Sequence, residues 1–178
     1  MNPSIADGLR DMRVGVLLSL LGILFGFGMG AVFGAFEDPL KAGLQADANA
    51  ALETRYGGDA AQAKAVVDKS WTYYKRAHMH GGGIGAAALA VLLVMAGVRA
   101  NRSLSRIAAA GLGVGALGYP IFWLLAGMRA PGLGSTGAAK ESLEWLAIPT
   151  VGALLLGLLL ALYGIATALY GARPDARS

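Results

Sequence analysis

The sequence has no cysteine and few charged residues. Only 15% of its 178 residues are charged and 56% are apolar, whereas about a quarter of the residues in soluble chains are charged. Without cysteine there is no disulfide framework, thiol catalysis or cysteine-ligated metal. Basic runs interleaved with aromatic residues are also lacking, so nucleic acid is not an expected partner despite the formal charge of +4. The composition is that of a membrane protein.

Enzyme motifs are missing as well. The chain has no phosphate-binding Gly-x-x-x-x-Gly-Lys sequence and no nucleophile elbow. Its glycine runs lie in apolar segments with no strand before them, which is not the setting of a nucleotide-binding loop. The sequence therefore indicates no catalytic residues and favours a protein that is not an enzyme.

Four charge-poor runs are long enough to cross a bilayer, which requires about 20 apolar residues in a helix. They are residues 14–36, 78–98, 107–128 and 143–170. The sequence therefore predicts an all-α integral membrane bundle of four transmembrane helices, surrounded by the lipid bilayer. The length indicates a single domain, residues 1–178.

Between the first two spans, residues 40–76 form a long polar segment with balanced acids and bases. Its alanine-rich halves predict two helices that are separated at Gly57-Gly58. We expect the second helix to run unbroken through residues 78–80. In the third span we expect Pro120 to interrupt the helix with a kink, and we expect residues 129–141 to form a loop.

The first span carries a glycine at every fourth position. These glycines are Gly22, Gly26, Gly30 and Gly34. Such spacing keeps small residues on one face of a helix, so that a neighbouring backbone can approach closely. The pattern predicts a packing face but leaves open whether the neighbour belongs to this chain or to another subunit.

The distribution of basic residues predicts the orientation. An even number of spans puts both termini on one side of the membrane. The head, the turn at 99–106 and the tail with Arg173 and Arg177 are rich in arginine, and basic residues in short loops mark the cytoplasmic side. We therefore expect a multi-pass protein of the bacterial inner (cytoplasmic) membrane, with both termini in the cytoplasm and residues 37–76 in the periplasm.

With this orientation, the two histidines and several polar residues share the outer, periplasmic-side depth. His78 and His80 begin the second span, and Tyr119, Arg129 and Glu144 lie at a similar level. Ionisable groups at membrane depth are costly, so they are candidates for function. The alternative is that the histidines are simply solvated at the lipid headgroups.

The conformation of this segment decides what the histidines can hold. In an extended segment, His78 and His80 would point to one side and could ligate a copper ion. In a helix they lie about 200° apart, and one of them could ligate a haem iron. We expect a continuous helix in which His80 faces the bundle and His78 is the more exposed, with Tyr119 and Glu144 as the nearest partners of His80.

Residues 76–82, Arg-Ala-His-Met-His-Gly-Gly, resemble the opening of a helix in small membrane proteins related to subunit I of haem–copper oxidases and nitric-oxide reductases. In that family a histidine at this place ligates haem. The resemblance implies at most a single haem b held by His78 or His80, because the family's other histidine-bearing helices have no counterpart in a chain with two histidines. Oxygen-reducing chemistry is not implied. The rest of the chain resembles small four-helix proteins of the bacterial inner membrane.

Three functions remain open from the sequence. The first is a redox-associated subunit with a haem or metal site, in which Tyr119, Arg129 and Glu144 surround His78 or His80. The second is a non-catalytic accessory or assembly subunit that packs through its glycine-rich helices, either as a homo-oligomer or with a partner in a membrane complex. The third is a component of an oligomeric channel or transporter, although four spans without buried charge or an evident repeat make a poor carrier.

Overall fold

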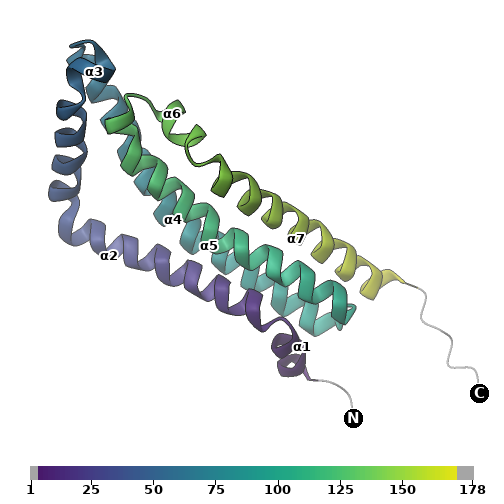
Figure 1. The fold of residues 1–178 in the computed structure, drawn as a ribbon. Coiled ribbons are helices and arrows are strands. Elements are labelled where there is room, and N and C mark those ends of the chain that lie inside the picture. Colours follow the sequence, from purple (N-terminus) through teal and green to yellow (C-terminus); the bar gives the residue numbers. More distant parts are fainter. Residues whose placement is uncertain (1–3, 172–178) are drawn as a thin grey trace, which may run out of the picture.

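The computed structural model describes residues 4–171, and this part of the chain is helical with no strands (Figure 1). The helices are α1 (Ile5–Asp11), α2 (Arg13–Ala50), α3 (Leu52–Tyr56), α4 (Ala60–Val98), α5 (Arg102–Leu133), α6 (Thr136–Glu141) and α7 (Glu144–Tyr170). By length and composition, α2, α4, α5 and α7 can each cross a membrane. The protein is thus an all-α multi-pass membrane bundle, as predicted.

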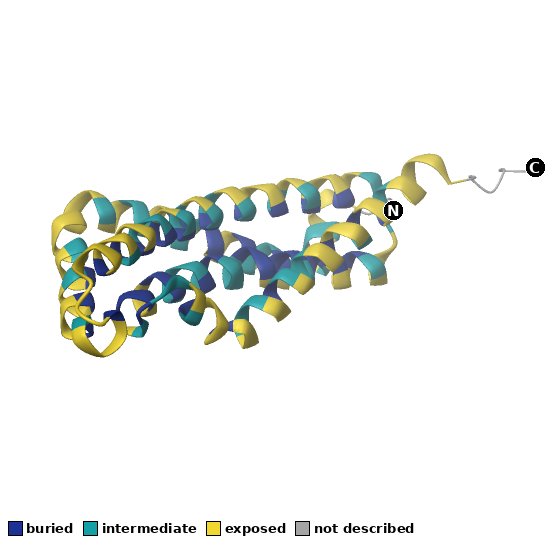
Figure 2. Cartoon of the chain, turned by 90° about the horizontal axis from the view of Figure 1, so that it is seen from above, coloured by how far each residue is buried: buried dark blue, intermediate teal, exposed yellow. Residues whose placement is uncertain are grey.

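Helix α5 is the centre of the bundle. It packs against α2, α4 and α7, whereas α7 makes few contacts with α4 and none of note with α2. In the most apolar stretch of α5, 44% of the residues are buried, against 17% in the corresponding stretch of α7. Figure 2 shows buried residues gathering where the helices face one another, while α7, which leads to the C-terminus, is largely exposed. The molecule is therefore a three-helix core with α7 laid along one side of α5.

The two ends of the bundle carry different elements. Figure 1 shows α1, the α4–α5 turn and the last turn of α7 at one end, which we call the terminal end. Helices α3 and α6 lie at the opposite end, which we call the hairpin end. The first and last described residues therefore share one side of the bundle. Arg173 and Arg177, on which part of the predicted charge bias rests, lie outside the described residues.

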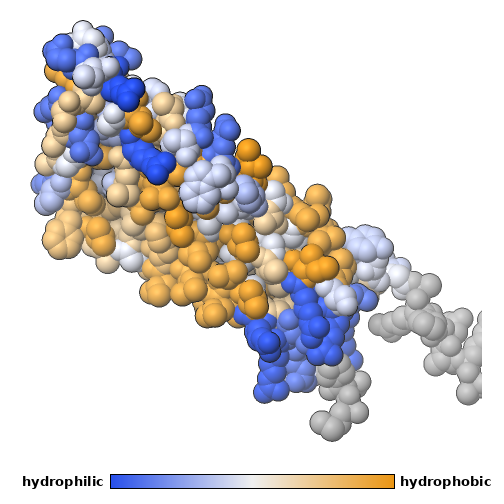
Figure 3. Space-filling model, in the orientation of Figure 1, coloured by the Kyte–Doolittle hydropathy of each residue, from blue (hydrophilic) through white to orange (hydrophobic). Residues whose placement is uncertain are grey.

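Helix α4 extends well beyond a bilayer. Its 39 residues span roughly 58 Å at 1.5 Å per residue, against about 30 Å of hydrocarbon. Its first half packs with the second half of α2 and with α3 to form a helical hairpin with its own core. The buried residues of that core are Leu44, Ala48, Ala51, Tyr56, Ala63, Val67 and Tyr74. The predicted helical segment at 40–76 is confirmed, and in Figure 3 hydrophilic residues gather at both ends of a hydrophobic middle.

The breaks in the hairpin follow from local chemistry. Gly57 and Gly58 both have positive φ, at 59° and 82°, which glycine adopts without a steric penalty. Helix α4 then begins after Asp59, whose side chain accepts a hydrogen bond from the Gln62 backbone N–H at 2.9 Å. This is the usual way to satisfy a free amide at a helix start.

The interruption of the helix expected at Pro120 is absent. Helix α5 keeps helical dihedral angles through this residue and continues to Leu133, and much of the expected loop at 129–141 is helical. Pro120 has no N–H for the Ala116 carbonyl, but Gly22 of α2 packs directly on that carbonyl, where a Cβ would lie 2.7 Å from the oxygen. Prolines are tolerated in membrane helices where a neighbour covers the freed backbone. The prediction was wrong because it treated the helix as isolated.

The bend of the bundle lies instead in α2. Phe36 has non-helical dihedral angles, φ −136° and ψ 26°, three residues before Pro39. A proline ring collides with the carbonyl four residues earlier, here that of Ala35. The helix is thus disrupted just where the chain leaves the apolar run of the first span.

The glycine face of α2 packs inside this chain. A Cβ on Gly22 would press on α5, as described above, and one on Gly26 would clash with the backbone nitrogen of Gly82 in α4. A Cβ on Gly34 would meet no atom within 4 Å. The neighbours of this face are therefore α4 and α5, and Gly34 takes no part in the contact.

A second set of glycines joins α5 to α7. These glycines are Gly111, Gly115 and Gly118 of α5 and Gly157 of α7, each of which lies against an atom of the other helix where a Cβ would stand. The sequence alone does not reveal this set, because the α5 glycines are spaced by four and then three residues and the remaining glycine belongs to another helix. Their effect is that α7 is held close to α5 along the membrane segment.

Candidate functional site

The two histidines lie on different faces of α4, as expected for a continuous helix. His78 shares a stripe with Tyr74 and Gly81, and this stripe faces α2. His80 shares a stripe with Arg76 and Gly83, which faces α5 and α7. Steps of three and four residues generate both stripes. The structure therefore places the histidines in two separate environments.

His78 is half-buried and packs against α2. Its Nδ1 lies 2.7 Å from the carbonyl oxygen of Gly26, and because a carbonyl only accepts, this nitrogen donates. The ring of Phe33 stands edge-on at 5.9 Å between centroids. A Cβ on Gly30 would lie 2.9 Å from His78 Cε1, so the glycine provides room for the imidazole. The expectation that His78 is the more exposed of the two histidines did not include this role of Gly30.

His80 lies in an aromatic cluster between α4 and α5. Its ring centroid is 5.2 Å from that of Tyr119 and 6.4 Å from that of Trp123. The guanidinium of Arg76 stands 4.8 Å above the Trp123 ring and 5.5 Å from the Tyr73 ring. We call these five residues the His80 cluster. A cation above an indole face is an attractive arrangement that also holds the indole in place.

One buried donor of the His80 cluster has no partner within the described residues. The indole Nε1 of Trp123 is buried and makes no hydrogen bond. Within residues 4–171, the histidine that forms a hydrogen bond is His78, not His80. Buried polar groups are normally paired, so a ligand that accepts hydrogen bonds would satisfy this cluster.

An apolar groove begins one helical turn below His80. It has a volume of about 260 Å³ and runs between α4 and α7 over α5. Its lining residues are Gly83, Ile84, Ala87, Ala88, Val91, Leu112, Leu154, Leu155 and Leu158. A Cβ on Gly83 would meet nothing within 4 Å, so there is free space beside this glycine, which lines the groove. The stripe of α4 that bears His80 therefore continues as one wall of an apolar slot.

Two of the predicted site residues lie elsewhere. Arg129 donates to the Ser142 side-chain oxygen at 3.1 Å, which ties the end of α5 to the start of α7. It stands roughly 15 Å further along α5 than Tyr119. Glu144 is exposed in the first turn of α7. Of the three predicted neighbours, only Tyr119 contacts His80, because the others lie beyond the end of the cluster.

Three members of the His80 cluster were not predicted as neighbours of His80. Tyr73 and Arg76 precede His80 by helical steps, and Trp123 follows Tyr119 by one turn of α5. These spacings could have placed all five residues of the cluster on two stripes, one on α4 and one on α5, once His80 was assigned to face α5.

The described residues offer no set of side chains that could form the predicted metal site. Within residues 4–171 there is no group of three or more histidine, aspartate or glutamate side chains that could hold an ion. His78 and His80 point to different helices, so they do not form the paired ligands that an extended segment would offer.

No protein-family model matches this chain, and comparisons with curated proteins and with solved structures found no match.

Proposed function

We propose that this protein binds a lipid-soluble quinone, with the ring against the His80 cluster and the isoprenoid tail in the α4–α7 groove. The observation that carries the proposal is the continuity of one α4 stripe, which bears the unpaired His80 and then lines the apolar slot from Gly83 onward. A polar, aromatic end joined to an apolar channel matches a molecule with a polar ring and an apolar chain. The protein would then serve as a redox-associated membrane subunit.

The chemistry of the His80 cluster suits a quinone ring. Quinone oxygens are hydrogen-bond acceptors, and the cluster offers the imidazole of His80, the phenol of Tyr119 and the unpaired indole N–H of Trp123. The aromatic side chains provide flat surfaces for stacking. Ligand sites in general combine an apolar lining with a few such polar groups.

The residues fit haem and copper less well. A copper ion held by both histidines would require them on one side of the segment, and they lie on different faces of α4. The groove beside His80 holds about 260 Å³, which is below the usual range of roughly 300–1,000 Å³ for ligand sites. It therefore accommodates a chain more readily than a macrocycle. The α2 glycines do not support the assembly role, because Gly22 and Gly26 already pack against α5 and α4 of the same chain.

Fluorescence of Trp123 tests the proposal directly. In a chain with Trp71→Phe and Trp145→Phe, Trp123 is the sole tryptophan, and decylubiquinone should quench it saturably in detergent. His80→Ala should weaken the apparent Kd about fivefold, because it removes one hydrogen bond worth about 1 kcal/mol.

A matched pair of glycine variants tests the groove. Gly83→Leu should fill the slot and abolish saturable quenching, whereas Gly82→Leu, which also meets no atom within 4 Å but is not among the lining residues, should bind normally. Quenching that rises linearly without saturation would refute the proposal. A Soret band that forms with added haemin in His78→Ala but not in His80→Ala would favour haem instead.

A further inference from the structure

A pocket at the terminal end of the bundle has a composition unlike that of the α4–α7 groove. It holds about 540 Å³ between α1, the end of α4 and the start of α5. Its floor is apolar and buried, with Met12 at 2% and Met95 at 1% exposure. Its rim carries Arg10, Arg99 and Arg102. The pocket thus combines an apolar base with a cationic edge.

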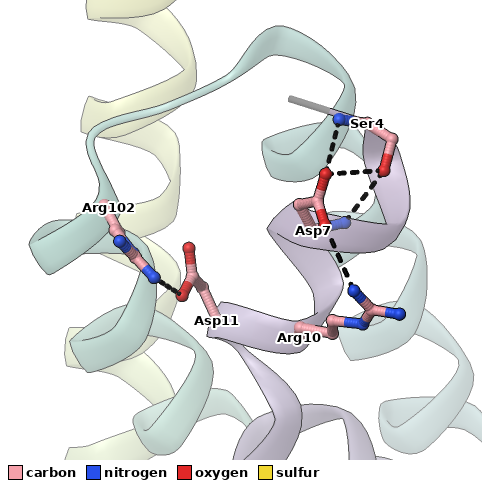
Figure 4. Close-up of polar contacts among 5 residues, drawn as sticks. All are labelled: Ser4, Asp7, Arg10, Asp11 and Arg102. Carbon is pink, nitrogen blue, oxygen red and sulfur yellow. Dashed lines mark hydrogen bonds and ion pairs between the residues drawn. The ribbon is translucent and has the colours of Figure 1, made fainter. Parts of the chain in front are cut away.

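The acidic residues of the rim are already engaged. Asp11 receives Arg102 at 2.6 Å and Arg106 at 2.9 Å. Asp7 caps α1 through Ser4 and lies 3.4 Å from Arg10 (Figure 4). Three arginines and two aspartates therefore line the pocket, which leaves its lining with a net charge of plus one, and Arg106 adds a further cation beside Asp11. Within residues 4–171, Arg99 forms no ion pair.

Arg99 occupies a position that normally belongs to glycine. It ends α4 in the left-handed region, with φ 56° and ψ 48°, and is the one non-glycine residue with positive φ in residues 4–171. Glycine is the usual residue at such a helix end because it has no Cβ. An arginine here gives the pocket a guanidinium that makes no contact with the acids of the rim.

The pocket lies where the apolar spans begin. The charge-free run of α2 starts at Val14 and that of α5 at Ile107, directly beside the rim. This is the level at which hydrocarbon meets phospholipid headgroups. Basic pockets between transmembrane helices are suited to anionic headgroups, and arginine pairs with phosphate through two parallel hydrogen bonds.

We propose that this pocket binds the headgroup phosphate of an anionic phospholipid, with Arg99 as the principal phosphate ligand and with Met12 and Met95 against the lipid's glycerol and upper acyl carbons. A free anion would bind the Arg99 guanidinium but would make no contact with the apolar floor at Met12 and Met95. The proposal is independent of the quinone site, with which the pocket shares no lining residue.

The variant Arg99→Gly tests this assignment without disrupting the fold. Glycine favours the left-handed conformation, so the helix end is kept while the cation is removed. Arg13→Ala is the matched control, since Arg13 is exposed at the same end but does not line the pocket. The wild-type protein in nanodiscs with equal phosphatidylglycerol and phosphatidylcholine should retain the anionic lipid preferentially in native mass spectrometry. Arg99→Gly should lower that preference about fivefold, and Arg13→Ala should not.

Three results would overturn the proposal. The first is equal retention of the two lipids by the wild-type protein. The second is an unchanged preference in Arg99→Gly. The third comes from a separate arm in neutral detergent, where inorganic phosphate alone protects the wild-type protein against heating as well as phosphatidylglycerol does, because the site would then recognise a soluble anion.

Discussion

Replacing Gly26 with alanine should destabilise the bundle, although alanine is the better helix former. A Cβ at this position would clash with the Gly82 backbone nitrogen and lie 2.9 Å from the Gly81 carbonyl carbon. Since no flexible side chain can move aside, α2 and α4 must part. Overpacking of this kind costs about 1–3 kcal/mol.

The separation has a second cost. His78 Nδ1 donates to the Gly26 carbonyl at 2.7 Å, and a shift of the order of an ångström breaks that bond. Interhelical hydrogen bonds in membranes contribute about 0.6 kcal/mol on average. The free energy of unfolding of Gly26→Ala should therefore fall by about 1.5–3.5 kcal/mol in total.

Gly28→Ala is the internal control for this prediction. It lies on the same helix, but a Cβ there meets nothing within 4 Å, so only the helix propensity changes, by at most about 1 kcal/mol in favour of alanine. Unfolding by sodium dodecyl sulfate in mixed micelles, followed by circular dichroism, measures both variants. Equal stabilities of Gly26→Ala and Gly28→Ala would show that the α2–α4 contact is looser than the structure has it.

Two further predictions concern the ends of the bundle. The hydrogen bond from Arg102, followed by that from Arg106, holds the pKa of Asp11 below its ordinary value of 3.8, so the attachment of α1 should be constant between roughly pH 5 and 8 and weaken only as pH falls below about 4. Asp11→Asn should lower the protection of the α1 amides against hydrogen exchange at pH 7, relative to their intrinsic exchange rates, and unchanged protection would contradict this role. Tyr56→Phe should lower the free energy of unfolding by about 1 kcal/mol, because the Tyr56 hydroxyl donates to the buried Pro131 carbonyl at 2.7 Å; an unaltered midpoint in the same detergent titration would show that the bond contributes nothing.

The secondary structure of this protein could largely be read from its sequence. The charge-free runs and the break at Gly57-Gly58 depend on composition and local conformation, so they predicted the spans and the hairpin. Pro120 shows the limit, since its effect depends on Gly22 of another helix covering the freed carbonyl. Local rules predict a kink wherever such a neighbour is ignored.

The site was less predictable than the fold. Helical geometry alone separates His78 from His80, and the pairing of His80 with Tyr119 followed from depth. Depth could not exclude Arg129 and Glu144, because residues at one membrane level can still lie on different helix faces or beyond a helix end. The placement of His78 depended on the missing side chain of Gly30, a signal that appears only once two helices are docked.

The glycine contacts of α5 with α7 and of α2 with α4 have a mechanical consequence for the groove. One wall of the groove belongs to α4, whose backbone has no room to move toward α2 at Gly26. The other belongs to α7, which meets α5 at Gly111 and Gly157 with equally little space. Each wall is thus clamped to a different helix, and the slot keeps its width when empty. Because the groove is preorganised, an isoprenoid chain can enter without the cost of rearranging the protein. A groove of fixed width also selects between apolar chains by their thickness.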